Sequence, residues 1–317
     1  MSLFLNQIRR FKFSFSVYNF FNQRKLAHNK ENYRKFKINQ PLFYSISSKD
    51  FIHKEKGEQP WLDREVNLGL FEEKLSTSNF SDETKTKLRD WKENGYLILN
   101  SFLNQSICNL INEEIDQLIQ NEKINFNSSG KIMFANKKSN YIDSITRNRE
   151  LIEILEFILG DKVIPFQTIN FIKGSEQDAH SDSIHMTTHP LGYLIAAWIA
   201  LEDISENQGP LSYYPGSHKL PYLLNDGYER GGNRFTVGAE ENYKNYEKKI
   251  SESIRENNFL KKKFIAKKGD ILIWHANLIH GGEPIVDKNS SRKSMVIHYF
   301  AENVIKYHEI NERPALL

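Results

Sequence analysis

The order of the apolar patterns along the chain limits its possible folds most strongly. Between Asp82 and Gly160, apolar residues recur with the spacing of amphipathic helices. After Gly160 the apolar stretches become short, rich in β-branched and aromatic residues, and bounded by Gly, Pro, Asp or Asn. They are VIPFQTINFIKG, LGYLIAAWIALEDI, GPLSYYPGS, GDILIWHANLIHG and RKSMVIHYFAE. Helices followed by strands predict an α+β fold whose strands form a jelly-roll barrel.

Three helices and one strand are expected before the barrel. SDETKTKLRDWKENG reads as one helix with Ser81 or Asp82 at its N-terminal cap and Gly95 at its end, and YLILNSFL follows as a short strand. RNRELIEILEFILG reads as a helix that ends at Gly160. The helix between them, NQSICNLINEEIDQLIQNEK, is expected to present one apolar face made of Ile107, Leu110, Ile111, Ile115 and Leu118.

The chain divides into an arm and one large domain. Residues 1–80 carry few periodic elements and are interpreted as an arm that covers the domain, which spans residues 81–317. A polar insertion at about 219–263 separates two of the predicted strands. It is either a solvated surface helix or a lid over the barrel mouth, since long insertions in compact domains are often functional.

Composition excludes some classes of protein. The 43 basic and 40 acidic residues give a net charge of +3, too even for the basic footprint of a nucleic-acid-binding protein. The single cysteine, Cys108, excludes an internal disulfide and fits a reducing compartment such as the cytoplasm. No stretch is apolar enough to predict a transmembrane helix. The basic, aromatic residues 1–21 are read as a docked arm, with a transit peptide or a membrane-surface segment as alternatives.

Metal-ligand chemistry is suggested by His180 and Asp182, which form an H-x-D pair, and by the distant His280. An octahedral Fe(II) site needs two imidazoles and one carboxylate on one face, with the other positions left open. Residues two apart on an extended segment point the same way, so H-x-D supplies two of these ligands. With ten histidines, about one such pair arises by chance. His53 and Glu55 form a second pair in the arm, without a strand pattern after it.

The surroundings of this pair resemble a known family. WKENGYLILNSFL, AHSD, AAWIALEDISENQGPLSYYPGSHK, KKGDILIWHANLIHGGEP and SRKSMVIHYF occur in the order and spacing typical of the phytanoyl-CoA dioxygenase family of 2-oxoglutarate oxygenases. The resemblance covers about residues 85–302. It implies a double-stranded β-helix (cupin-like jelly roll) flanked by N-terminal helices.

By this resemblance, His180, Asp182 and His280 look like the iron ligands. His275 lies five residues before His280 and is an alternative ligand. His280 is preferred because a Gly-Gly pair follows it, as in the family's H-G-[S/G] block. The family often has Ser where Gly282 stands, so one hydroxyl contact to 2-oxoglutarate is missing from this position.

The resemblance also implies a pocket for 2-oxoglutarate. Arg292 follows the distal histidine by twelve residues, the place of the family's cosubstrate-binding arginine. A buried carboxylate favours a permanently charged, bidentate partner. On a strand, Ser294 lies on the same side as Arg292. Trp198 matches a family tryptophan near the cosubstrate, and Gln167 and Asn170 are further candidate polar contacts.

The expected activity is that of an Fe(II)- and 2-oxoglutarate-dependent dioxygenase. It would consume O2, release succinate and CO2, and hydroxylate an aliphatic C–H bond of a small molecule or acyl-type metabolite. Asp182 favours hydroxylation, because related halogenases have a small residue there. Two alternatives are a jelly-roll protein that binds a ligand or metal without turnover, and an enzyme with a desaturase or epimerase outcome. His185 and His189 either contact substrate or are satisfied core residues.

Overall fold

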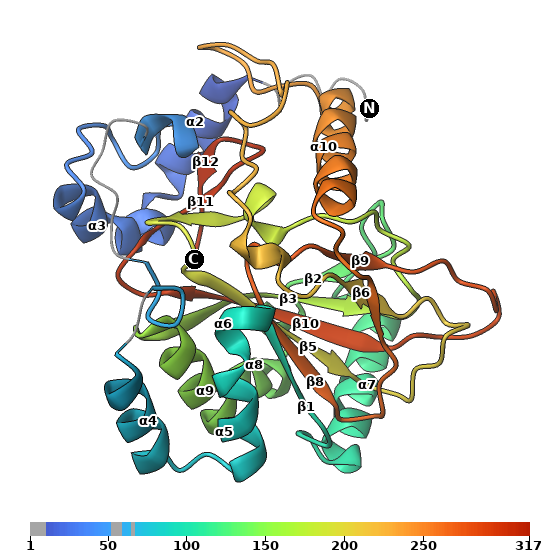
Figure 1. The fold of residues 1–317 in the computed structure, drawn as a ribbon. Helices are drawn as coiled ribbons and strands as arrows, with labels where there is room; N and C mark the ends of the chain where they lie inside the picture. Colours follow the sequence, from blue (N-terminus) through green and yellow to red (C-terminus); the bar gives the residue numbers. More distant parts are fainter. Residues whose placement is uncertain (1–10, 52–58, 65–66) are drawn as a thin grey trace.

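The computed structural model describes residues 11–51, 59–64 and 67–317. Its centre is a six-stranded antiparallel sheet in the order β1-β8-β5-β10-β3-β2 (Figure 1). The strands are β1 (Tyr96–Leu99), β2 (Ile132–Met133), β3 (Val163–Phe171), β5 (Leu194–Ala200), β8 (Ile271–His275) and β10 (Ser294–Ala301). Most strands that are neighbours in this sheet are far apart in sequence, and a jelly roll has this connectivity.

Two three-stranded sheets lie on the other side of the barrel. One has the order β7-β6-β9 and the other β12-β11-β4. Their strands are β4 (Thr187–His189), β6 (Leu211–Tyr213), β7 (Lys262–Phe264), β9 (His280–Gly282), β11 (Ile305–His308) and β12 (Arg313–Pro314). A buried cluster that includes Trp198, Leu211, Phe264 and Trp274 fills the space between the large sheet and the first of these. The expected α+β jelly roll is therefore confirmed.

Helices cover the outer face of the large sheet, below it in Figure 1. They are α4 (Leu68–Thr77), α5 (Asp82–Arg89), α6 (Trp91–Asn94), α7 (Gln105–Gln120), α8 (Asn140–Thr146) and α9 (Arg149–Leu159). Ser81 caps α5 by accepting from the Thr84 N–H, and Gly160, with φ +71°, ends α9. The largest apolar core lies between these helices and the sheet.

Two details differ from the sequence predictions. The first helix is interrupted at Asp90, so that α5 and α6 are separate, although Gly95 does end the second one in the left-handed conformation. In α7, Leu110 is 48% exposed, and Cys108 is buried instead. A short thiol-bearing residue counts as a small hydrophobe in a core, so the apolar face of α7 is rotated slightly from the predicted one.

The arm packs on the barrel. Its first part carries α2 (Lys12–Phe21) and α3 (Lys30–Lys35), with short 3₁₀ turns η1 (Gln23–Asn29) and η2 (Ser48–Phe51). The last helix within residues 1–80, α4, packs instead into the main core on the helix side of the large sheet. Tyr33, Ile46 and Phe51 form a buried cluster with Ile305 and Tyr307 of β11. The described part of the arm is thus docked on the domain. Within the described residues, no helix is both long and apolar enough to cross a membrane.

The insertion carries one long helix, α10 (Tyr243–Glu256), after a short turn η6 (Glu240–Asn242). One face of α10 is exposed, but Tyr246 and Ile250 on the other face are buried against Ile184 and Ile279. Ile184 closes the turn η4 (Asp182–Ile184), and Ile279 precedes β9. The insertion is therefore packed beside the H-x-D segment rather than being solvated on all sides.

Candidate metal centre

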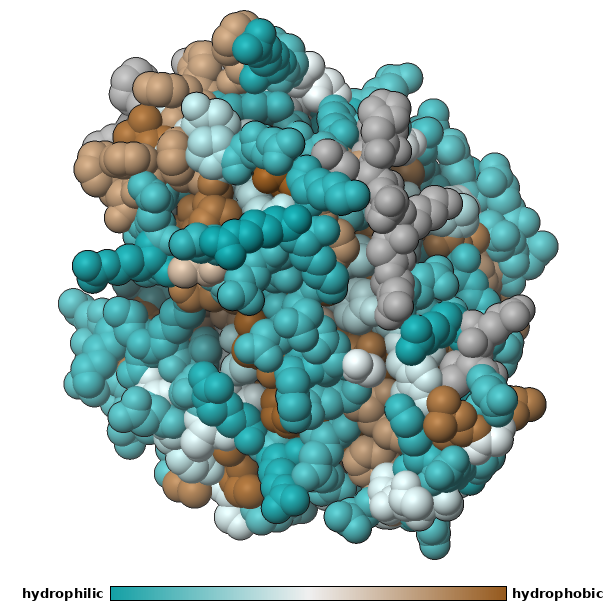
Figure 2. All heavy atoms as spheres, turned by 90° about the vertical axis from the view of Figure 1, so that its left-hand side faces the viewer, coloured by the Kyte–Doolittle hydropathy of each residue, from teal (hydrophilic) through white to brown (hydrophobic). Residues whose placement is uncertain are grey.

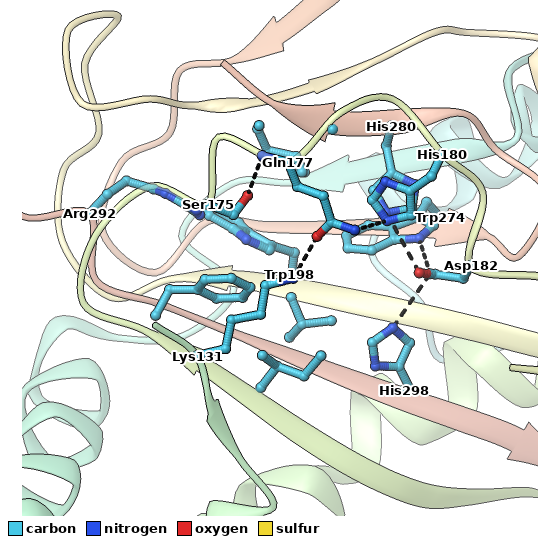
Figure 3. Close-up of a pocket in the computed structure, with 16 residues that line it drawn as sticks. Lys131, Ser175, Gln177, His180, Asp182, Trp198, Trp274, His280, Arg292 and His298 are labelled. Atoms are coloured by element: carbon cyan, nitrogen blue, oxygen red, sulfur yellow. Dashed lines mark hydrogen bonds and ion pairs between the residues drawn. The ribbon is translucent and has the colours of Figure 1, made fainter. Parts of the chain in front are cut away.

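His180 and His280 are brought together by the backbone. They form an antiparallel bridge in which each N–H donates to the other's carbonyl at 2.9 Å. Side chains of directly opposed residues lie on the same face, and the two rings are 4.5 Å apart between centroids. Asp182 points to the same place from the start of η4 (Figure 3). The candidate ligand atoms of all three residues lie within 4.8 Å of one another, and all three residues are buried.

The tautomers of both histidines suit metal binding. His180 Nδ1 lies 2.8 Å from the carbonyl of Asp178, and His280 Nδ1 lies 2.9 Å from the carbonyl of Leu278. A carbonyl can only accept, so each Nδ1 carries the proton and each Nε2 keeps its lone pair. In metal sites the second ring N–H of a ligating histidine commonly donates to a backbone carbonyl, which fixes the tautomer and the orientation of the ring.

Asp182 is held as a carboxylate. Trp274 Nε1–H donates to Asp182 Oδ2 at 2.8 Å, and His298 Nε2 lies 3.4 Å from the same oxygen. The other oxygen, Oδ1, lies 3.7 Å from His280 Nε2. One oxygen is therefore fixed by the tryptophan, and the other faces the histidine pair.

The electrostatics favour an ionised carboxylate and neutral imidazoles. Burial raises the pKa of Asp182, but the adjacent His280 and His298 lower it more, so the net pKa is well below its ordinary value. Burial lowers the pKa of both His180 and His280. These are the protonation states that a divalent metal requires of its ligands. The donor set, two imidazoles and one carboxylate, fits Fe(II).

His275 does not face this centre. It follows Trp274 on β8, so its side chain lies on the opposite face of the sheet. Its Nε2 contacts Asp63 Oδ2 at 2.9 Å, and its Nδ1 accepts from the Asn277 N–H at 3.0 Å. Both ring nitrogens of His275 are thus engaged elsewhere. The other candidate pair in the sequence, His53 and Glu55 in the arm, lies outside the described residues.

A buried arginine lies in the same cavity. Arg292 is 2% exposed, and its guanidinium lies 5.0 Å from the Phe171 ring and 5.4 Å from the Trp198 ring. Its Nη1 donates to Ser294 Oγ at 3.0 Å. Among the described residues, none accepts a hydrogen bond from its Nε and none forms an ion pair with it. Burial lowers its pKa to about 10, so it remains charged at neutral pH.

Sequence reasoning missed several residues of this cavity. Lys131, from the loop before β2, donates to Gln177 Oε1 at 2.5 Å, and Gln177 Nε2 lies 3.1 Å from His180 Nε2. Ser175 lies beside Gly282, since a β-carbon built on Gly282 would be 2.6 Å from Ser175 Oγ. The hydroxyl that position 282 lacks is therefore present on a neighbouring segment. All of these residues line the cavity between the triad and Arg292 (Figure 3).

The two candidate amides on β3 differ in position. Gln167 faces the barrel interior, where its Nε2 lies 3.4 Å from His298 Nδ1. Asn170 does not reach the cavity, because it pairs in register with Met295 and Ile132, which both belong to the core on the helix side. Asn170 thus lies on the wrong face of β3 for a cosubstrate contact.

The insertion reaches the metal-binding segment through two tyrosines. Tyr246 Oη accepts from the Ser181 N–H at 2.8 Å, so α10 holds the residue between the two H-x-D ligands. Tyr243 Oη lies 3.3 Å from Nε2 of His185, whose ring is 5.5 Å from the His180 ring. His185 is therefore next to the centre. His189 is remote from it and stacks on Phe51 at 4.0 Å.

Fold and site together define a class. A jelly roll with a buried two-histidine, one-carboxylate triad and a buried arginine in one cavity is the arrangement of Fe(II)- and 2-oxoglutarate-dependent dioxygenases. The model of the phytanoyl-CoA dioxygenase (PhyH) family matches residues 91–294 of the chain. The chain belongs to this family, and its enzyme class is that of an Fe(II)/2-oxoglutarate dioxygenase.

The curated relatives are distant in sequence. Peroxisomal phytanoyl-CoA dioxygenase of Bos taurus is 24% identical over 243 residues, 67% of each chain. The Homo sapiens enzyme is 22% identical over 218 residues, and the match covers 61% of its length. Phytanoyl-CoA dioxygenase domain-containing protein 1 of Danio rerio is 32% identical over 111 residues, 34% of this chain and 33% of its own.

Solved structures share the fold. The α-ketoglutarate-dependent carbocyclase SnoK from nogalamycin biosynthesis has a TM-score of 0.57 and 17% identity, over 72% of this chain and 86% of its own. EctD from S. alaskensis, solved with 2-oxoglutarate and 5-hydroxyectoine, has a TM-score of 0.55 and 16% identity, over 79% of this chain and 85% of its own. At these identities the likeness concerns the fold alone.

Proposed function

We propose that His180, Asp182 and His280 ligate Fe(II) and that Arg292 anchors the distal carboxylate of 2-oxoglutarate. The observation that carries this proposal is the unpaired charge of Arg292 in the same cavity as the triad. Burial is the larger effect on this guanidinium and the charge of Glu202 offsets it only in part, so a bound carboxylate would lower the remaining cost of the buried cation. The chain already positions the guanidinium between two aromatic rings, so little side-chain entropy is lost on binding.

We assign further contacts with 2-oxoglutarate to residues that line the cavity. Ser294 orients the guanidinium, and Trp198 stacks on it. Ser175 offers a hydroxyl, and Lys131 offers a second cation on the same side as Gln177. Gln167 contacts His298 rather than the arginine end, so we assign it a role in holding His298 beside Asp182.

When bound, iron and 2-oxoglutarate would supply O2 activation coupled to the release of succinate and CO2. We propose that the chain uses this chemistry to hydroxylate an aliphatic C–H bond of a small molecule. The residues keep the reactants in place: Trp274 and His298 hold Asp182, and two carbonyls hold the imidazoles. The buried walls keep bulk water from the reacting atoms. We further propose that α10 closes the substrate side, because Tyr243 reaches His185 beside the centre.

The test is substrate-stimulated succinate formation by the full chain with added Fe(II). The panel contains acyl-CoA thioesters, free fatty acids and small amino-acid derivatives, and the mass of each product is measured. A gain of about 16 mass units supports hydroxylation. A loss of two hydrogens, or a change of stereochemistry without mass change, would favour a desaturase or epimerase outcome. No succinate with any compound, in protein shown to bind iron and 2-oxoglutarate, would favour the ligand-binding alternative.

We propose that the protein is located in the cytoplasm and acts on a small molecule rather than on nucleic acid. Cys108 is a buried free thiol and the sole cysteine, which is compatible with the reducing cytoplasm. The even charge balance favours a small-molecule substrate over nucleic acid. Fluorescence microscopy of the chain tagged at its C-terminus tests the location, and an organellar signal would refute the cytoplasmic assignment.

A further inference from the structure

The arm presents a group of exposed aromatic side chains, here called the aromatic patch. Figure 2 shows hydrophobic side chains gathered over the arm in the upper part of that face. Phe13 and Phe21 of α2 are 77% and 80% exposed. The patch consists of Phe13, Tyr18, Phe20, Phe21, Tyr44 and Phe235. Monomeric proteins seldom expose apolar groups together in this way unless the surface binds something.

The patch is continuous across segments that are distant in sequence. The Phe20 ring lies 5.7 Å from the Phe21 ring and 5.3 Å from the Phe43 ring, which in turn lies 5.0 Å from Tyr44. A groove of about 540 Å³ runs between α2 and this second segment. On the other side, the Lys12 N–H donates to the carbonyl of Phe235 at 2.9 Å, which places the insertion beside the start of α2.

Basic residues predominate in the part of the arm that carries the patch, although Glu31, which is exposed, follows directly. Residues 11–30 contain four basic residues and no Asp or Glu. Arg24, Lys25 and Lys30 are exposed, and Arg234 is exposed next to Phe235. Lys12 is paired with Glu312 and is not part of this charge. The arm is held in place from below by Leu26, which is fully buried, so the rings and the cations are presented on a fixed support.

We propose that the aromatic patch binds the surface of an anionic lipid bilayer. Aromatic rings are favoured at the depth of the lipid headgroups, and basic residues are attracted to anionic lipids. Tyr18 and Tyr44 carry hydroxyls that can stay at the polar level while the phenylalanines enter. A second copy of the chain is a poorer occupant, because a symmetric contact would bring the same cations together. The described chain lies on the bilayer and does not span it.

The experiment is co-sedimentation of the full chain with vesicles. One set contains phosphatidylcholine alone, and the other contains equal parts of phosphatidylcholine and phosphatidylserine. We expect binding to the anionic vesicles, weaker binding to the neutral ones, and release as salt is raised. Phe13→Ser/Phe21→Ser should weaken binding by about tenfold or more. These side chains are largely exposed, so the variant keeps its core contacts.

Matched variants control for general effects. Leu68→Ser/Leu260→Ser removes two side chains that are 79% and 82% exposed away from the patch, and it should bind like the wild type. Arg24→Glu/Lys25→Glu should lose the preference for anionic vesicles, whereas Lys123→Glu/Arg255→Glu, with the same change of net charge, should keep it. The proposal is overturned if the wild type does not sediment with anionic vesicles, or if the control pairs lose as much binding. It is also overturned if the patch instead forms a dimer that Phe13→Ser/Phe21→Ser dissolves in sedimentation velocity.

Discussion

His180 and His280 exchange two backbone hydrogen bonds of 2.9 Å, although one hundred residues separate them in the chain. The bridge joins the H-x-D segment to β9 and brings both imidazoles to one face of the barrel interior. Because the backbone sets this relationship, it does not depend on a metal being present. Removing one imidazole should therefore affect metal binding much more than folding.

The first prediction concerns the ligand set. His180→Ala, Asp182→Ala and His280→Ala should each weaken divalent metal binding by more than about 100-fold, since losing a group that merely orients a ligand already costs about 10–100-fold. Co(II) titration followed by calorimetry and visible absorption measures this. His275→Ala should keep metal affinity and lose stability instead, because it strands Asp63. A metal affinity that falls in His275→Ala but not in His280→Ala would reverse the assignment.

The second prediction concerns Ser175 and Gly282. Ser175→Ala should raise the KM for 2-oxoglutarate by about tenfold, the loss of one hydrogen bond to a charged group. Gly282→Ser should be harmful, because its β-carbon would lie 2.6 Å from Ser175 Oγ and 2.9 Å from the Glu176 nitrogen. Titration of 2-oxoglutarate at saturating iron measures both effects. Ser290→Ala, at a half-buried site that does not line the cavity, is the control. An unchanged KM for 2-oxoglutarate in Ser175→Ala would show that Ser175 does not contact the cosubstrate.

The third prediction concerns the contact between α10 and the metal-binding segment. Tyr246→Phe leaves the buried Ser181 N–H without its acceptor, which should cost about 1–3 kcal/mol of unfolding free energy. Metal affinity should fall as well, because Ser181 lies between two proposed ligands. Tyr228→Phe is the matched control, since this buried tyrosine of the insertion donates to Asn225 and not to the ligand segment. Equal metal affinity in Tyr246→Phe and Tyr228→Phe would show that the contact from α10 does not influence metal binding.

Deletion of residues 231–257 extends this test to the lid. The deletion removes Tyr246 and Ile250, which pack against residues next to the proposed ligands. We expect both metal binding and substrate-coupled turnover to suffer. Tyr243→Phe removes only the contact to His185, and should lower substrate-coupled turnover while iron affinity is kept. Turnover unchanged in Tyr243→Phe would argue against a lid role for this face of α10.

The sequence predicted the parts of the site that local patterns encode. H-x-D places two side chains on one side, and alternation along the segment that leads into β10 places Ser294 beside Arg292. The same alternation, continued to Val296 and His298, identifies the histidine next to Asp182. The position of His298 is therefore encoded in the local pattern of the strand. The α+β order of the chain likewise follows from the change of apolar period near Gly160.

Other parts depend on tertiary register and could not be read locally. β3 is buried on both faces, between the helices and the barrel interior, so its sequence does not reveal which face Asn170 occupies. Lys131 and Gln177 come from connecting segments whose place depends on how the barrel closes. The position of Ser175 beside Gly282 is of the same kind, because it joins two segments more than one hundred residues apart.

The fourth prediction concerns pH. His189 is 7% exposed and stacked on Phe51, and burial lowers its pKa from 6.5 to about 4. Between these values the unfolded chain binds a proton that the folded chain does not, so stability falls as pH is lowered. Going from pH 7 to pH 5, this residue should remove about 1–2 kcal/mol of unfolding free energy. Urea unfolding at both pH values should show a smaller decrease for His189→Phe, which keeps the stacking. An equal decrease in both proteins would contradict the assignment.

The last prediction is that Arg292 anchors 2-oxoglutarate. Its charge is buried between Phe171 and Trp198, and its polar contact is to Ser294 Oγ, a neutral group. Arg292→Ala should weaken 2-oxoglutarate binding by about 2–4 kcal/mol, the range for stranding one partner of a buried charge pair. Arg292→Lys keeps a charge but loses the forked guanidinium and its stacking plane. Its affinity for 2-oxoglutarate should therefore lie between those of the wild type and Arg292→Ala.

Two features make this test specific. Iron affinity should change little in either variant, because Arg292 lies at the far end of the cavity from the triad (Figure 3). Lys293→Ala is the neighbouring control, since Lys293 points to the other side of the strand and pairs with Asp116 at 3.2 Å. Arg292→Ala should change the stability of the free protein only modestly. The packing lost against Phe171 and Trp198 is offset by removal of a buried charge that the electrostatic effect of Glu202 compensates only in part. In contrast, the rise in melting temperature on adding 2-oxoglutarate should disappear. If Lys293→Ala abolishes that rise and Arg292→Ala does not, the cosubstrate lies on the other face of β10 and the assignment of the pocket is wrong.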